Sequence, residues 1–239
     1  MPAYPTSNPA WKTPVTRSLK FDTGIMQGTN GVEQRWMRDL GVETWSLPYP
    51  LITLAQRNTL FAAFEAAKGA YDQTISLAFD GTTYTGLYFD GDTLPFTESR
   101  PTMYSGTVKL TTTVRPVDSG TLPTDFPNLS TGAVTQLPYT KSSGFDTVSV
   151  RTDGGRFAYP KRNTALHSWT AGGTVLTKAE AQAVWDCFRL AGGMLKSIAF
   201  TDPDSITRYS NCRFLSDSIT WTIIAPGQHS ITCAIQELA

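Results

Sequence analysis

Residues that commonly carry catalysis are scarce in this chain of 239 residues. It has two histidines and three cysteines, 17% of its residues are charged, and twenty basic side chains balance twenty acidic ones. A chain without net charge lacks the broad electrostatic surface that grips nucleic acid or an anionic membrane. No apolar run approaches the eighteen or so residues of a membrane span. We therefore expect no nucleic-acid specificity and no membrane partner.

The cysteines give no sign of a disulfide framework or a metal site. Cys187, Cys212 and Cys233 are odd in number and lack metal-binding or redox spacing. The first residues also lack the basic and apolar regions of a secretion signal. We expect reduced, packed thiols in a chain made in a cytosol.

What the sequence does have is β-branched and aromatic residues in period-two runs. Asp80-Gly81, flanked by runs at 74–79 and 83–89, is a hairpin signal, and 106–114 alternates as a closing strand. A turn is also predicted at 28–31. The second half has comparable runs at these positions: 196–201, 207–215, 219–224 and 230–236. These patterns predict a mainly β protein.

The sequence repeats itself at an offset of 124 residues. A search for such repeats comes first because it organises the whole chain. The gap-free identities are Phe21/Phe145, Asp22/Asp146, Thr23/Thr147, Gly31/Gly155, Arg38/Arg162, Trp45/Trp169, Thr53/Thr177, Ala55/Ala179, Phe64/Phe188, Ala67/Ala191 and Gly69/Gly193. The offset then drifts, so that Ser76–Phe79 faces Ser197–Phe200 and Phe89 faces Phe214. We interpret this as a tandem duplication.

Each copy contains one predicted helix, at 54–68 and at 178–191. Thr followed three residues later by Gln or Glu forms a capping box at each start. An apolar stripe at three-to-four spacing follows, and a glycine that tolerates left-handed backbone ends each helix. The residues that define these features and the repeat-equivalent core are Thr53, Gln56, Leu60, Phe61, Phe64, Gly69 and Trp45 in the first copy, and Thr177, Glu180, Val184, Trp185, Phe188, Gly193 and Trp169 in the second.

The predicted fold class is mainly β (α+β), with two tandem β-sandwich or barrel domains that each carry one α-helix. The first domain spans 1–115 and the second spans 145–239. Residues 116–144 are rich in Pro, Ser, Thr and Gly and have few charges. This composition is typical of a linker or an extended arm.

No constellation of catalytic residues stands out, and we expect no enzyme, no cofactor and no metal. A Cys187–His167 dyad is disfavoured because Cys187 falls in the helix core. The carboxylates at 90, 92 and 98, and at 202 and 204, fit turns better than a calcium loop, because neither stretch completes the twelve-residue pattern. The Gly-Gly pairs at 154–155, 172–173 and 192–193 do not follow a strand into a helix as a phosphate loop does, and we interpret them as bends.

Tryptophans and basic residues each leave two interpretations open. The six tryptophans, mostly core by their repeat positions, could instead include a sugar-stacking platform, which requires Trp36 or Trp221 to be exposed. The basic residues form either a solvated face or ion pairs across a subunit boundary. They are Arg35, Arg38, Arg57, Arg151, Arg156, Lys161 and Arg162.

Several motifs resemble the distal-tail and minor-tail proteins of long-tailed phages. The first copy reads Gly-x-x-Gly-x-Glu-Gln-Arg over 28–35, then Trp45, Pro-Leu-Ile-Thr at 50–53, and a helix that ends in Phe64-x-x-x-x-Gly69 before the Phe79-Asp80 hairpin. The chain is similar in this respect to the lambda-type minor tail protein M and to distal-tail components of gene transfer agents. The second copy keeps Trp169 and the helix motif but has lost Glu-Gln-Arg.

The resemblance implies a structural component of the virion tail tip, assembled in the host cytoplasm. Such a protein forms a homo-oligomeric ring that joins the tail tube protein to the baseplate hub and other tail-tip proteins. Three chains with six similar domains, or six chains, would both satisfy sixfold symmetry. The alternative from another class is a carbohydrate- or receptor-binding module of the tail tip.

Overall fold

The computed structural model describes residues 3–6, 11–27, 33–70, 74–114, 124–127, 129, 140–145, 147–152, 155–160 and 165–238, with the backbone alone at 124, 147–152 and 155–160. The predicted turn at 28–31 and most of the predicted linker at 116–144 lie outside the described residues.

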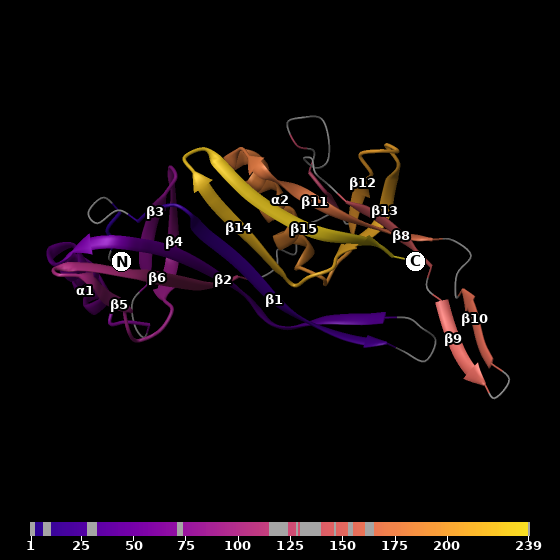
Figure 1. The fold of residues 1–239 in the computed structure, drawn as a ribbon, viewed down its shortest axis with the longest axis horizontal. Helices are drawn as coiled ribbons and strands as arrows, with labels where there is room; N and C mark the ends of the chain where they lie inside the picture. The colour runs from indigo at the N-terminus through magenta and orange to yellow at the C-terminus, as the bar shows by residue number, and fades with distance from the viewer. Residues whose placement is uncertain are drawn as a thin grey trace. The chain divides into compact units, whose positions relative to one another are not determined.

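The fold is mainly β, as predicted. Strands make up 60% of the chain, and thirteen of them belong to one large, mostly antiparallel sheet. The described residues hold two helices, α1 (Leu54–Ala66) and α2 (Lys178–Ala191). The strands, labelled in Figure 1, are β1 (Val15–Gln27), β2 (Glu33–Thr53), β3 (Ile75–Phe79), β4 (Thr82–Phe89), β5 (Phe96–Arg100), β6 (Met103–Val114), β7 (Thr124–Asp125), β8 (Lys141–Gly144), β9 (Thr147–Thr152), β10 (Gly155–Pro160), β11 (Leu166–Leu176), β12 (Ile198–Thr201), β13 (Arg208–Phe214), β14 (Ser218–Ala225) and β15 (Gln228–Glu237).

Contacts within the chain define two compact units that interleave along the sequence. Unit 1 comprises Met1–Phe21, Leu40–Arg115 and Thr220–His229. Unit 2 comprises Asp22–Asp39, Pro116–Ile219 and Ser230–Ala239. The end of the β1–β2 hairpin therefore belongs to unit 2, and the turn between β14 and β15 belongs to unit 1. Strands of 13 and 21 residues, such as β1 and β2, are long enough to contribute to more than one compact body.

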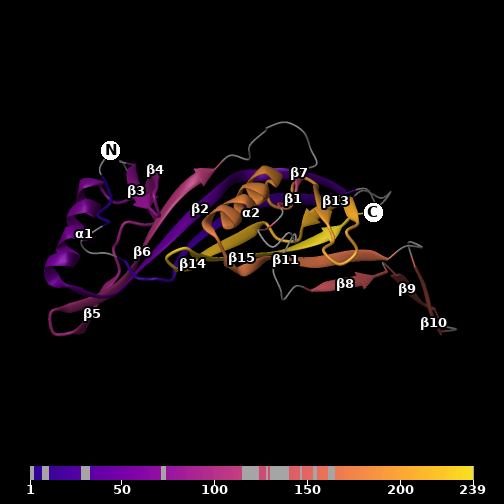
Figure 2. The ribbon, with the colours of Figure 1, turned by 90° about the horizontal axis from the view of Figure 1, so that it is seen from above.

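Unit 1 is built around the pairing of β2 with β6, in which Trp45 faces Leu110. Burial alternates along β2, so that Trp45, Leu47 and Tyr49 point into the core while the residues between them are half-buried. This is the period-two pattern of a strand with one face in the core. β4 pairs with β6 and with β3, and α1 follows β2 directly (Figure 2).

Unit 2 has a comparable order of elements around α2. β8 pairs with β11, with Trp169 opposite Lys141, and β13 pairs with both β12 and β15. α2 contributes seven buried residues to this core: Glu180, Ala181, Val184, Trp185, Cys187, Phe188 and Ala191. The Phe188 ring meets Phe214 edge-on, with the ring centroids 5.0 Å apart.

Both helices begin with a complete capping box. The Thr53 hydroxyl accepts the Gln56 amide at 3.3 Å, and the Gln56 side chain accepts the Thr53 amide at 2.9 Å. Thr177 and Glu180 make the same two bonds, at 3.3 and 2.9 Å. Each box satisfies amides at the helix start that have no intrahelical acceptor.

The backbone turns left-handed where each helix ends. Gly192 and Gly193 have φ of 64° and 65°, and Gly69 has φ of 66°. Lys68 adopts φ of 54° at the position equivalent to Gly192, a conformation that costs a non-glycine residue some stability.

The apolar stripe of α1 is less covered than that of α2. Leu60 is buried, but Phe61 and Phe64 are only half-buried, whereas their counterparts Trp185 and Phe188 are almost inaccessible. Apolar spacing predicts which face of a helix turns inward, but not how much of the fold covers that face.

A short arm lies beside the first strand after the helix in each unit. The Tyr4 amide donates to the Ser76 carbonyl at 2.8 Å, and the Phe126 amide donates to the Ala199 carbonyl at 2.8 Å. Both arms run parallel to the strand they contact. Phe126 is buried, so this part of the predicted linker contributes to the core of unit 2. Composition alone could not show it, because one buried aromatic ring barely changes a Pro-, Ser- and Thr-rich average.

Candidate assembly interface

Asp202, one of the candidate carboxylates from the sequence, has the hydrogen bonds of a turn. Asp202 is fully buried, forms an ion pair with Lys141, and accepts the Asp204 amide and the Ser205 hydroxyl, both at 3.0 Å. Burial works to raise the pKa of Asp202, but the hydrogen bonds from Lys141, Asp204 and Ser205 together lower it. This carboxylate anchors a loop, which is the role that Asp commonly has in turns.

Two more of the candidate carboxylates each accept a hydrogen bond from a different backbone amide. Asp92 accepts the Ala70 amide at 3.4 Å, and Glu98 accepts the Thr102 amide at 3.0 Å. Across the described ranges, no three His, Cys, Asp or Glu side chains come together as a metal ion would require.

The dyad considered from sequence is not assembled. His167 Nδ1 lies 2.6 Å from the Ser143 hydroxyl, while the Cys187 thiol lies 4.0 Å from the Asp125 carbonyl. Burial raises the pKa of both Cys187 and Cys212 to about 12, and that of Cys233 also rises. None of the three cysteines forms a disulfide.

We expect the thiols of the folded protein to resist alkylation. At pH 8, a rise of the thiol pKa from 9 to about 12 reduces the reactive thiolate roughly a thousandfold. Iodoacetamide labelling of Cys187 and Cys212, followed by peptide mass spectrometry, should be at least about a hundredfold slower in the native protein than in 6 M guanidinium. Comparable rates in the two conditions would contradict the burial of these side chains.

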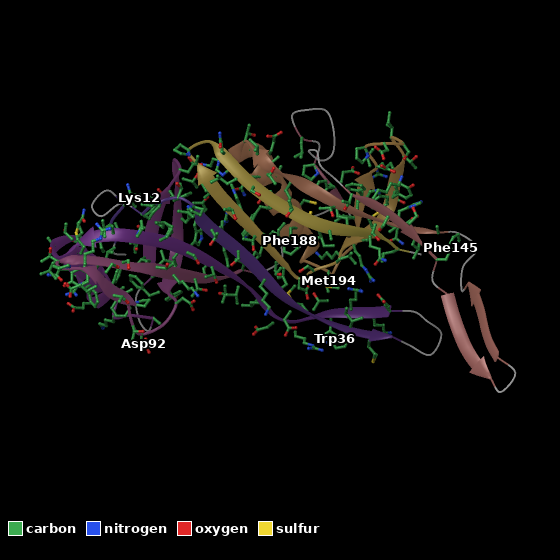
Figure 3. The ribbon with its side chains drawn as sticks, viewed as in Figure 1. Lys12, Trp36, Asp92, Phe145, Phe188 and Met194 are labelled. Carbon is green, nitrogen blue, oxygen red and sulfur yellow. The ribbon has the colours of Figure 1, made fainter. Side chains whose placement is uncertain are left out.

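Most tryptophans are in the core. Trp45, Trp169, Trp185 and Trp221 are all at most 3% exposed, and the Trp221 indole donates to His229. Trp36 differs, since it is 44% exposed on the β1–β2 hairpin (Figure 3). Its ring lies over Gly24, where a Cβ atom would come within 2.4 Å of it.

Three of the seven basic residues singled out from sequence have described side chains, and each of the three has a different neighbour. Arg35 bonds Glu33, Arg38 is an exposed neighbour of Asp22 at 3.8 Å, and the Arg57 guanidinium lies over the Tyr104 ring at 4.3 Å. The side chains of the remaining four lie outside the described residues: Arg151, Arg156, Lys161 and Arg162.

The principal site in unit 2 is the surface that binds the end of the β1–β2 hairpin. It consists of Asp217, Met194 and Arg213, and we call it the Asp217 seat. Asp217 Oδ2 accepts the Thr23 amide and Oδ1 accepts the Thr23 hydroxyl, both at 2.8 Å. Oδ1 also accepts the amide of Met194, in the loop after α2, at 2.9 Å. One carboxylate therefore joins the hairpin to the end of the helix, and carboxylate acceptors make stronger hydrogen bonds than neutral ones.

Charged groups complete the Asp217 seat. Arg213 of β13 contacts Glu33 at 2.6 Å, and Arg35 donates to the Met194 carbonyl at 3.1 Å. Hydrogen bonds from Arg35 and then Arg213 lower the pKa of Glu33. The Glu-Gln-Arg stretch of the resemblance thus supplies two hairpin contacts. Sequence reasoning missed the partners, Arg213 and Asp217, because they lie 180 and 194 positions away from Glu33 and Thr23.

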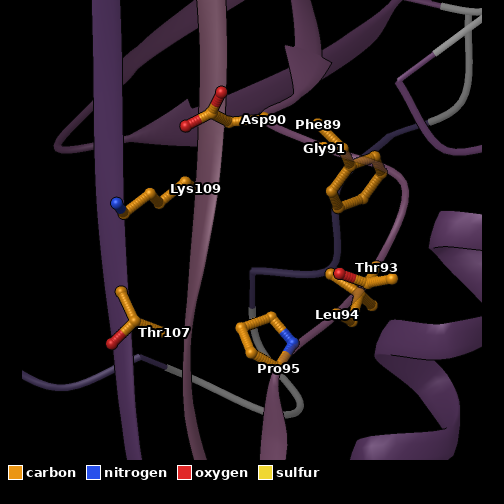
Figure 4. Close-up of a pocket in the computed structure, with 8 residues that line it drawn as sticks. All are labelled: Phe89, Asp90, Gly91, Thr93, Leu94, Pro95, Thr107 and Lys109. Atoms are coloured by element: carbon orange, nitrogen blue, oxygen red, sulfur yellow. The ribbon is translucent and has the colours of Figure 1, made fainter.

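Unit 1 has a pocket of about 230 Å³ beside the loop between β4 and β5. The loop forms one side through residues 90–95, and Thr107 and Lys109 of β6 form the other (Figure 4). Asp92 belongs to the same loop.

The comparisons with known proteins give no identification: no family model matches the chain, and no curated protein matches its sequence. Neither described helix has the length and apolar character needed to cross a bilayer.

Proposed function

We propose that the chain is a structural component of a long-tailed phage tail tip, a distal-tail or minor tail protein that forms a ring joining the tail tube to the baseplate hub. In this proposal the chain consists of two tandem β-sandwich domains with one helix each. Its partners are further copies of itself, the tail tube protein, and the hub with other tail-tip proteins. Its site of action is the virion.

The observation that carries the proposal is the Asp217 seat. A hairpin that begins in unit 1 ends among the residues of unit 2 and is fixed there by a carboxylate and an ion pair. Exchange of such an extension is a contact that can recur between successive bodies, and head-to-tail contacts that recur with a constant rotation close into rings. The neutral composition is compatible with this role.

We expect the purified full chain to assemble into closed rings of three or six copies. Three chains supply six similar domains, so a trimer would match a sixfold tube. Mass photometry would give the number of chains, and negative-stain electron microscopy would show whether the particles are annular. A protein that is monomeric at every concentration up to the millimolar range contradicts the proposal.

The exposure of Trp36 favours one alternative, a carbohydrate- or receptor-binding module. An exposed indole offers a stacking face for a sugar ring. Saturable glycan binding that Trp36→Ala abolishes would favour that function. The burial of Trp221 removes the second platform that this alternative would use.

A further inference from the structure

The β1–β2 hairpin has a counterpart in the second copy. At the repeat offset of 124 residues, Thr23 corresponds to Thr147 in β9, and Glu33 corresponds to Phe157 in β10. β9 and β10 pair with each other in an antiparallel register that sets Phe157 opposite Val150. Among the described strands, these two form a sheet of their own (Figure 1). The first-copy hairpin is therefore seated, while its counterpart pairs with no other described strand.

The Asp217 seat also has a counterpart, in unit 1. The match of Phe89 with Phe214 relates Asp92 to Asp217 and Tyr88 to Arg213. The geometry agrees, because each aspartate accepts an amide from the loop that follows its helix: Asp217 from Met194 at 2.9 Å and Asp92 from Ala70 at 3.4 Å. Asp92 is exposed, whereas Asp217, beneath the seated hairpin, is half-buried. We call the surface of Asp92 and Tyr88 the Asp92 seat.

We propose that the β9–β10 hairpin of one chain docks on the Asp92 seat of a second copy of the same chain. The position of Thr147 at Asp92 then corresponds to that of Thr23 at Asp217. This inference rests on the ring proposed above and names its subunit contact. The occupant is a second copy because the seated hairpin runs from unit 1 to unit 2. In a head-to-tail series, the β9–β10 hairpin of unit 2 would in the same way reach the unit that follows, which is unit 1 of the next chain.

The chemistry of the two seats changes in a matched way. At the Asp217 seat, a glutamate of the hairpin faces an arginine, with Glu33 and Arg213 2.6 Å apart. At the corresponding positions of the proposed contact, the hairpin has Phe157 and the seat has Tyr88, whose side chain is 37% exposed. A change on one side alone would leave a charge without a partner in an interface, which is costly. The change on both sides replaces an ion pair by an aromatic pair.

This match also accounts for the loss of Glu-Gln-Arg in the second copy. Arg35, which donates to the Met194 carbonyl, corresponds to Tyr159, so the second hairpin has neither charge of the first. The two kinds of contact then alternate around a ring of three chains, ionic within each chain and aromatic between chains. The different chemistry prevents the two hairpins from exchanging seats.

A charge-restoration experiment tests the contact. Phe157→Glu should weaken self-association at least about tenfold, because it places a carboxylate against Tyr88. Adding Tyr88→Arg should restore association by recreating the pair seen between Glu33 and Arg213. Tyr88→Arg alone should also weaken it. Sedimentation velocity over a concentration series measures each variant, and a thermal melt checks that each one folds.

A cross-link distinguishes this contact from the ring itself. The variant Asp92→Cys with Thr147→Cys should form disulfides between chains on mild oxidation and give a ladder that ends at the ring size. Thr23→Cys with Asp217→Cys, the matched control, should give only monomers on a denaturing gel. Rings that form without the cross-link, or a cross-link confined within one chain, would overturn the docking proposal and leave the ring standing. Cross-linked open filaments would support the docking and overturn the ring. A chain that neither associates nor cross-links would overturn both.

Discussion

Replacement of Glu43 by alanine is expected to lower the free energy of unfolding by about 3–5 kcal/mol, since it leaves a buried arginine without its carboxylate. Glu43 Oε1 accepts from the Arg17 guanidinium at 2.7 Å and from the Trp45 indole at 2.8 Å. Arg17 is 5% exposed and Glu43 6% exposed, so the charge of Arg17 would be left in a site that bulk water barely reaches. Chemical denaturation followed by tryptophan fluorescence measures the change.

The comparison variants for Glu43 separate charge from packing. Glu65→Ala, at an exposed position of α1, should change stability by less than about 0.5 kcal/mol. The double variant Arg17→Met with Glu43→Leu should be markedly more stable than Glu43→Ala, because apolar residues of similar volume can replace a buried ion pair. A loss below about 1 kcal/mol for Glu43→Ala would show that Arg17 reaches solvent when the carboxylate is removed.

Local features of the fold could be predicted from sequence. Each capping box depends on two residues three positions apart, so Thr53 with Gln56, and Thr177 with Glu180, are recognisable without knowledge of the rest of the chain. Period-two runs likewise depend on neighbouring residues and predict a mainly β chain. The predicted helix at 178–191 coincides with α2, and the one at 54–68 extends two residues past α1.

Long-range features could not be predicted in the same way. The cluster of Arg17, Glu43 and Trp45 depends on the register of β1 against β2, which neither strand specifies alone. The association of residues 22–39 with unit 2 depends on Asp217, at the opposite end of the chain. Charge and spacing do not reveal such partners. The sequence repeat points to such partners only after the contacts of one copy are known and can be compared with the equivalent positions of the other.

The seat residues show what a repeat adds to a single sequence. From sequence, Asp92 fits a turn and Asp217 does not stand out, yet each accepts a bond from the loop after its helix. The additional bonds from Thr23 distinguish Asp217. The docking proposal rests on this difference between the two positions.

A second large effect is expected at Gly172 of β11. This residue has φ of +98°, and a Cβ atom on it would lie 2.2 Å from the carbonyl oxygen of Ile231. Substitution by alanine therefore adds a clash with backbone to the strain of a left-handed conformation. The strain alone costs about 1–2 kcal/mol, and we expect Gly172→Ala to lose at least about 3 kcal/mol in total, because backbone cannot rotate away as a side chain does.

Gly227 is the matched control, because it separates strain from clash. It has φ of +74°, and nothing lies within 4 Å of the position that its Cβ would occupy. Gly227→Ala should therefore cost only the conformational strain of about 1–2 kcal/mol. Urea denaturation of the two variants side by side measures the difference. If Gly172→Ala lowered the free energy of unfolding no more than Gly227→Ala does, the Gly172 backbone would not lie as close to the Ile231 carbonyl as the structure shows. The Gly-Gly pair at 172–173 would then be only the bend that its sequence predicts, whereas a clear excess would show that glycine is required there for close backbone approach.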